Sequence, residues 1–116
     1  MIMQENKIKK AVVTGGAGFI GSNMVDKLVE MGVQVTVIDN LSTGKRENIN
    51  SAAYFWEQDL VTAEIETISE YLKDVDAVFH FAAMARVQPS IEDPVMFNEH
   101  NVTATLKLLK SCSQKY

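Results

Sequence analysis

Three glycines at fixed spacing constrain this chain more than any other feature. Gly16-x-Gly18-x-x-Gly21 fits the dinucleotide-binding fingerprint, and the spacing of Gly15, Gly18 and Gly21 fits a close variant. The surrounding segment, 11–25, carries no charged residue. Glycine suits a sharp turn from a strand into a helix where backbone N–H groups approach a pyrophosphate, because a Cβ would block both. A helix that begins near Gly18 would direct its partially positive N-terminus at the phosphates.

The context of this run distinguishes it from an ordinary glycine-rich turn. Apolar residues at positions 20, 24, 28 and 31 recur at helical spacing, so we expect them to share one helix face. A β-branched strand then ends in Asp39, which falls 18 residues after Gly21. That is close to the spacing of a carboxylate that binds a ribose. A Walker-type phosphate loop is excluded, because Gly21 is followed by Ser22 and not by lysine.

The composition indicates a soluble globular protein of one domain. Of its 116 residues 47% are hydrophobic and 22% are charged, and the net charge of −4 gives no support for nucleic-acid binding. No apolar run reaches the length of a membrane span, and the N-terminus lacks a signal-peptide core. The single cysteine, Cys112, fits a reducing compartment. We therefore expect a cytoplasmic protein with no nucleic-acid or membrane partner and no metal site.

Alternating strand and helix patterns predict an α/β fold. The expected strands are 9–14, 34–38, 54–58 and 75–81, and the expected helices are 18–31, 65–72 and 94–112. This order predicts a Rossmann-type, doubly wound parallel sheet with strand order 3-2-1-4. The ligand crevice would lie between the first and fourth strands, with 14–18 facing 81–85. On the last helix, the predicted buried face consists of Val95, Val102, Leu106 and Leu109.

Five segments in order resemble a known family. They are 14–21, 39–44, 59–60, 80–83 and 101–105, and together they span nearly the whole chain. They are similar to the extended short-chain dehydrogenase/reductase family, in particular to its NAD-dependent epimerases and dehydratases of nucleotide-sugars. One departure is Ala104, where that family usually has glycine.

The resemblance implies that NAD is the cofactor, with the glycine segment at its phosphates. Gly15, Gly18 and Gly21 would form the phosphate turn, and Phe19 and Ile20 would offer backbone to the pyrophosphate.

The same resemblance assigns the rest of the cofactor. Asp39 and Asn40 would bind the adenosine ribose, and Asp59 and Leu60 would meet the adenine. The residues implied for the nicotinamide route and its support are Phe81, Ala82, Ala83 and Asn101.

Each role has a structural alternative. Asp39 could simply cap the turn at Asn40, Asp59 could be a turn residue, and Asn101 could be an exposed helix residue. A lone histidine in an apolar strand, such as His80, is more often a satisfied core residue than a catalyst. A carboxylate at position 39 would repel a 2′-phosphate and so favours NAD over NADP. Lys45 and Arg46, which are interpreted as solvated surface residues, are close enough in sequence to leave the choice between NAD and NADP open.

The resemblance implies a reaction that these residues cannot complete alone. In that family NAD takes a hydride from the sugar C4 and returns it to the other face, with a Tyr-x-x-x-Lys pair as acid/base. Tyr54 and Tyr71 have no lysine four residues on, and Tyr116 is the last residue. We therefore expect 1–116 to be a truncated dinucleotide-binding domain with no catalytic residue, whose nucleotide-sugar substrate binds only the full-length protein. The alternative is a stand-alone dinucleotide-binding or interaction module. We also expect a homo-oligomer, formed through the fourth strand or the last helix.

Overall fold

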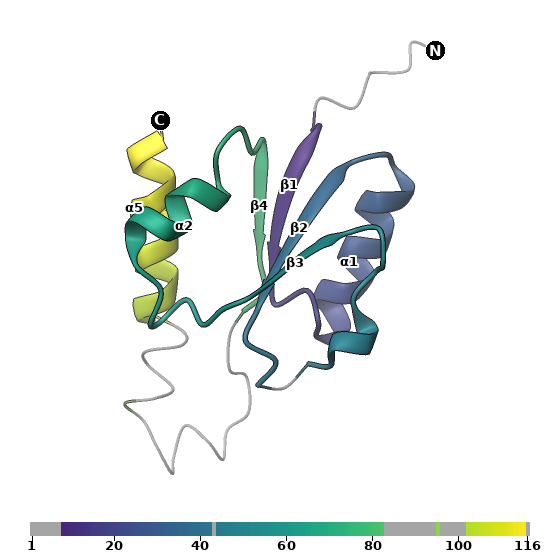
Figure 1. The fold of residues 1–116 in the computed structure, drawn as a ribbon, viewed down its shortest axis with the longest axis horizontal. Helices are drawn as coiled ribbons and strands as arrows, with labels where there is room; N and C mark the ends of the chain where they lie inside the picture. The colour runs from purple at the N-terminus through teal and green to yellow at the C-terminus, as the bar shows by residue number, and fades with distance from the viewer. Residues whose placement is uncertain (1–7, 43, 83–94, 96–101, 116) are drawn as a thin grey trace.

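The computed structural model of the chain describes residues 8–42, 44–82, 95 and 102–115. Figure 1 shows the arrangement of the elements. In chain order they are β1 (Lys10–Thr14), α1 (Phe19–Glu30), β2 (Gln34–Asp39), the 3₁₀ helix η1 (Arg46–Asn48), β3 (Tyr54–Glu57), α2 (Ile65–Tyr71), β4 (Ala77–His80) and α5 (Ala104–Lys115). None of the helices formed by these residues combines the length and apolarity needed to cross a bilayer.

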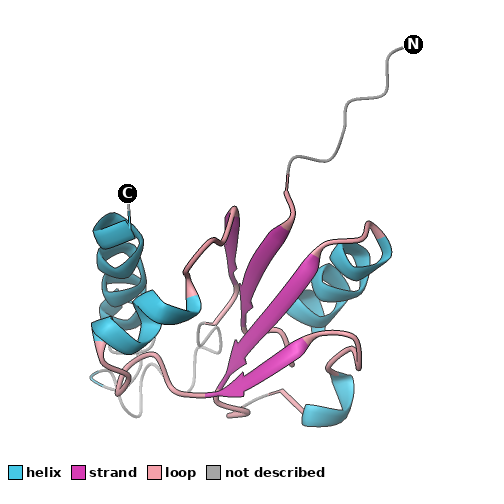
Figure 2. Cartoon of the chain, turned by 45° about the horizontal axis from the view of Figure 1, so that its top comes forward, coloured by secondary structure: helices cyan, strands magenta, loops and turns pink. Residues whose placement is uncertain are grey.

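The four strands form one parallel sheet in the order β3-β2-β1-β4, as the sequence predicted. In the register of the central strand, Val13 lies beside Val37 on β2 and beside Phe79 on β4. All four carboxyl ends meet at the same edge of the sheet (Figure 2). The described segments that the sequence assigned to ligand binding, 15–21, 39–40, 59–60 and 81–82, each lie at or just after one of these ends.

The period of two along the strands gives each face of the sheet its own apolar core. On the α1 face the buried cluster consists of Ala11, Val13, Val25, Leu28, Val33, Val35 and Val37. On the other face it consists of Val12, Ile38, Leu60, Ala63, Ile68, Leu72, Val75, Ala104 and Leu108. Figure 1 shows the helices divided in the same way, with α1 on one side and α2 and α5 on the other. The sheet is therefore covered on both faces, as its β-branched strands require.

The expected face of α1 is buried only in part, with Leu28 in the core and Met24 packed against it. The buried residues of α1 are Gly21, Val25 and Leu28, whereas Ile20 and Met31 are exposed. The reason is the close approach of Gly21 to the turn below it, which fixes the rotation of the helix about its axis. With that rotation fixed, Ile20, one position earlier, points outward.

The buried face of α5 was also predicted wrongly. Val95, Val102, Leu106 and Leu109 are all exposed, and the residues that α5 buries are instead Ala104, Leu108 and Ser111. Small side chains let α5 approach α2 closely: the Ser111 hydroxyl donates to the carbonyls of Lys107 and Ile65. Apart from Val95, the expected start of this helix near position 94 lies outside the described residues.

Candidate dinucleotide site

The glycine turn leaves β1 and enters α1, and at two of its positions the protein backbone leaves no space for a side chain. Gly15 has a φ of +73°, and a Cβ on it would lie 2.7 Å from the carbonyl carbon of Phe81. A Cβ on Gly21 would lie 2.1 Å from the carbonyl oxygen of Gly15. Both contacts are with the backbone of the protein itself, so these two glycines are needed for the turn before any ligand binds.

The turn delivers a helix N-terminus that no side chain caps. Gly18 is the N-cap, and the first bond of the helix runs from the Ser22 N–H to the Gly18 carbonyl at 2.9 Å. Within the described residues, the backbone N–H groups of Phe19 and Ile20 have no acceptor. Their side chains are exposed, at 83% and 65%. Unpaired first-turn N–H groups and the helix dipole together favour an anion at this point.

Asp39 lies directly against the glycine turn. Its carboxylate is buried; Oδ2 accepts the Ala17 N–H at 3.0 Å and Oδ1 accepts the Leu41 N–H at 2.6 Å. The second bond forms the local turn that the sequence offered as an alternative. The first bond joins β2 to the glycine turn, 22 residues earlier in the chain. Each oxygen keeps lone-pair capacity for a further donor.

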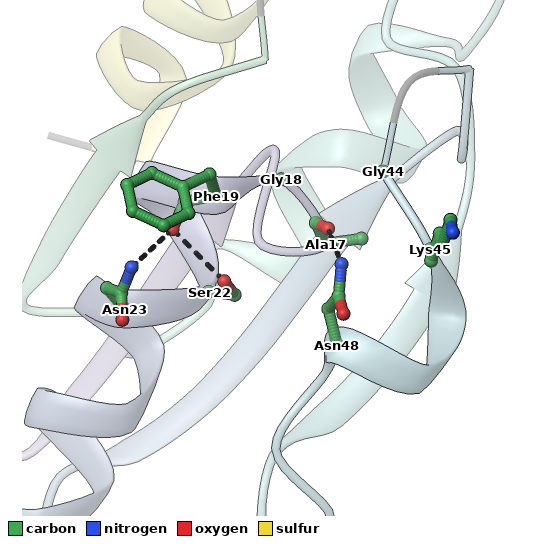
Figure 3. A pocket seen from close by; sticks show the side chains of 8 residues that line it. All are labelled: Ala17, Gly18, Phe19, Ser22, Asn23, Gly44, Lys45 and Asn48. Atoms are coloured by element: carbon green, nitrogen blue, oxygen red, sulfur yellow. Dashed lines mark hydrogen bonds between the residues drawn. The ribbon is translucent and has the colours of Figure 1, made fainter.

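The segment after β2 binds the other backbone group of Ala17. The Ala17 carbonyl accepts the Lys45 N–H and the Asn48 side-chain amide, each at 3.2 Å. These groups border a cavity of about 440 Å³ (Figure 3). Its lining residues are Ala17, Gly18, Phe19, Ser22, Asn23, Gly44, Lys45 and Asn48.

Of those lining residues, the sequence predicted Gly18 and Phe19 as site residues and not the other six. Ser22 and Asn23 donate their side-chain hydrogen bonds to the Phe19 carbonyl, and Asn48 reaches the turn from η1 (Figure 3). The first two lie within one turn of the helix start, which was the available signal. No local pattern marks Asn48, because its partner is 31 residues away. Lys45 is exposed, as expected, and also borders the cavity.

A second cavity, of about 350 Å³, lies past the ends of β2 and β3. Asp59 and Asn40 both line it, which brings these two predicted residues together. Asp59 is also a turn residue, since its Oδ1 accepts the Val61 N–H at 2.8 Å. The Leu60 side chain is buried in the core beside α2, so only its backbone could face a ligand. The other lining residues are Ser42, Glu57, Gln58 and Thr62.

The end of β4 faces the glycine turn, as predicted. Phe81 and Ala82 lie against Gly15, and both of their N–H groups reach the Thr14 hydroxyl, at 3.1 and 3.2 Å. His80 has a partner on each ring nitrogen, which fits the expected satisfied core residue, and burial lowers its pKa. Two of the predicted site residues, Ala83 and Asn101, lie outside the described residues.

Comparison with known proteins identifies the family. The model of the NAD dependent epimerase/dehydratase family matches residues 11–115. The chain belongs to this family. The resemblance carried by the five short segments is thereby confirmed over nearly the whole chain.

Individual relatives agree with the family assignment. A putative UDP-glucose 4-epimerase of Methanocaldococcus jannaschii is 43% identical over 99 residues, which are 85% of this chain and 32% of that protein. The Thermus thermophilus UDP-glucose 4-epimerase, solved in complex with NAD, has a TM-score of 0.81 and 42% identity, over 91% of this chain and 34% of its own. A UDP-N-acetylglucosamine 4-epimerase of Methanobrevibacter ruminantium has a TM-score of 0.85 and 44% identity, over 95% and 36%. The chain thus spans about a third of the length of these relatives and has their Rossmann fold.

Proposed function

We propose that this family member binds NAD at the carboxyl edge of its sheet. The observation that carries the proposal is the 3.0 Å bond from the Ala17 N–H to the Asp39 carboxylate. This bond places an acid that could accept ribose hydroxyls beside the turn that leads into the uncapped N-terminus of α1. The glycine turn and the acid can bind one ligand only if they lie close together in space, and this hydrogen bond joins them.

Each part of the cofactor has candidate residues in this chain. We assign the pyrophosphate to the N–H groups of Phe19 and Ile20, and the ribose to the free lone pairs of Asp39. The cavity past β2 and β3, with Asn40 and Asp59 on its wall, would take the adenine. Phe81 and Ala82, together with Ala83 and Asn101 outside the described residues, would lead to the nicotinamide. A 2′-phosphate near Asp39 would meet a like charge, so we expect NAD to bind more tightly than NADP.

We infer further that the chain is the NAD-binding portion of a sugar-nucleotide epimerase or dehydratase. The support is its similarity to enzymes described as UDP-glucose 4-epimerases. When bound, NAD supplies reversible hydride transfer. The residues of this chain would bind the cofactor, orient it and keep water from one side of it. The 116 residues contain no Tyr-x-x-x-Lys, so we expect the chain alone to bind NAD without converting a nucleotide-sugar.

The alternative is a module that binds a dinucleotide or a partner protein without chemistry. The exposed Leu106 and Leu109 on α5, with the exposed Val102 just before it, fit a contact with another surface under either proposal. The coding sequence after Tyr116 separates the two: a downstream Tyr-x-x-x-Lys supports the enzyme, and a stop codon supports the module.

Calorimetric titration of the 116-residue chain with NAD and with NADP tests the cofactor assignment. We expect saturable binding of NAD and at least about tenfold weaker binding of NADP, which corresponds to one unfavourable charge contact. A sample that unfolds cooperatively, and is therefore folded, yet binds neither nucleotide up to about 1 mM would refute the proposal.

A further inference from the structure

A hydroxyl at the end of β1 connects the two segments that face each other across the proposed site. Thr14 is fully buried. Its Oγ1 accepts the Phe81 N–H at 3.1 Å and the Ala82 N–H at 3.2 Å, and lies 2.5 Å from Nδ1 of His80. Three nitrogen atoms thus surround one hydroxyl oxygen, which has two lone pairs and one proton.

Counting protons around this oxygen fixes the state of the imidazole ring. The two backbone N–H groups can only donate, so both face lone pairs of the Thr14 hydroxyl, although Phe81 shares its N–H with the Thr14 carbonyl. The single proton of that hydroxyl then goes to His80, whose Nδ1 must be an unprotonated acceptor. The ring proton of a neutral imidazole is left on Nε2, which lies 2.8 Å from the Thr105 hydroxyl on α5. A proton on Nδ1 would place three donors around Thr14 Oγ1 and leave the hydroxyl proton with no acceptor among the described residues.

The same atoms hold the segment after β4 close to the glycine turn. A Cβ on Gly15 would lie only 2.8 Å from the Ala82 nitrogen, so the segment after β4 is seated directly on the glycine turn. The N–H of Phe81 also reaches the Thr14 carbonyl, at 2.9 Å. For Ala82, however, the Thr14 hydroxyl is the one acceptor within the described residues. The orientation of that hydroxyl therefore decides whether Ala82 is held against the turn.

We propose that His80, fixed as the neutral Nε2–H tautomer between Thr14 and Thr105, is a positioning residue for dinucleotide binding. It accepts the Thr14 proton, which aims the lone pairs of that hydroxyl at Phe81 and Ala82 and holds their segment on the phosphate turn. Through Nε2 it ties β4 and β1 to α5 as well. The role rests on the proposed function, since Phe81 and Ala82 are assigned to the nicotinamide side of the cofactor.

Nitrogen NMR of the ¹⁵N-labelled chain at pH 7.5 tests the tautomer without any ligand. The chain has two histidines, so the His100→Asn variant assigns the signals of His80. We expect Nδ1 of His80 to appear as an unprotonated acceptor and Nε2 as protonated. A protonated Nδ1, or averaging between the two tautomers, would overturn the inference even if NAD binds.

Two pairs of variants test the positioning role through the affinity for NAD. Thr14→Val removes the hydroxyl and Thr14→Ser keeps it; His80→Leu removes the acceptor, and His80→Asn offers its amide oxygen near the position of Nδ1. We expect Thr14→Val and His80→Leu to weaken NAD binding about tenfold, the loss of one buried hydrogen bond, and the two conservative variants to stay within about threefold of the unaltered chain.

Cooperative urea unfolding of each variant separates loss of the site from loss of the fold. If His80→Leu does not fold, the threonine pair tests the same bond. Equal NAD affinities for folded Thr14→Val and Thr14→Ser would overturn the positioning role. Absence of NAD binding by the unaltered chain, with the expected tautomer present, would refute the proposed function and the positioning role together, whereas a wrong tautomer with intact NAD binding overturns this inference alone.

Discussion

Replacing Asp39 by asparagine tests the central contact of the site. The two carboxylate oxygens each accept a backbone N–H, from Ala17 at 3.0 Å and from Leu41 at 2.6 Å. An asparagine amide has the same shape but only one acceptor atom. In either orientation its NH₂ group faces one of the two N–H donors, which then has no acceptor. The substitution therefore changes one buried hydrogen bond without changing the packing volume.

The structure gives the size of the effect. A hydrogen bond to a charged group contributes about 1.5–3 kcal/mol, and a buried donor left unpaired costs about 1–3 kcal/mol. We therefore expect Asp39→Asn to lower the free energy of unfolding by roughly 2 kcal/mol. Because the Ala17 peptide would no longer be fixed and a ribose acceptor would be lost, NAD affinity should fall by about thirtyfold. NADP should lose less, because a charge that opposes its 2′-phosphate has been removed.

Urea unfolding followed by the fluorescence of Trp56, the chain's one tryptophan, measures the first quantity, and calorimetric titration measures the second. Asp26→Asn is the matched control: it removes the same charge from an exposed carboxylate on α1, whose bond from the Asn50 amide an amide oxygen can still accept. If Asp39→Asn bound NAD as tightly as Asp26→Asn, the assignment of the ribose to this acid would be wrong.

Three further changes have defined outcomes. Gly21→Ala sets a methyl 2.1 Å from the Gly15 carbonyl, so NAD binding should be lost with a destabilisation of about 1–3 kcal/mol; unchanged affinity in the titration would contradict the turn geometry. Burial lowers the pKa of His80, so the folded state is most stable above pH 6.5 and becomes less stable as the pH falls from there toward the folded-state pKa. Urea unfolding at pH 7.5 and at pH 5.5 should show a smaller loss of stability for His80→Asn than for the unaltered chain. Leu106 and Leu109 lie on the exposed face of α5, so Leu106→Glu and Leu109→Glu should shift any oligomer seen by light scattering toward monomer. A clean monomer of the unaltered chain at high concentration would refute the predicted association.

Some features of the site were readable from local sequence. The glycine spacing, the acid at the end of the second strand and the alternation of strands with helices each follow from rules that act over a few residues, and the strand order followed from them. The buried face of α5 was misread, and that of α1 was misread in part, because a helix with apolar residues on several sides has more than one plausible buried face. Contact with the Gly15 turn selects the face of α1, and the small-residue contact with α2 selects that of α5.

The sequence by itself determined where the chain turns, which acid is the candidate for binding the ribose and which family the chain resembles, because these depend on residue type and spacing alone. Only the tertiary structure decided that the Asp39 carboxylate accepts the Ala17 N–H, that Asn48 binds the carbonyl of the same residue and that Thr14 and Thr105 contact the two ring nitrogens of His80. Each of those bonds joins groups 22 to 66 residues apart. Their directions depend on the register of neighbouring strands and the seating of α5, which no local pattern encodes.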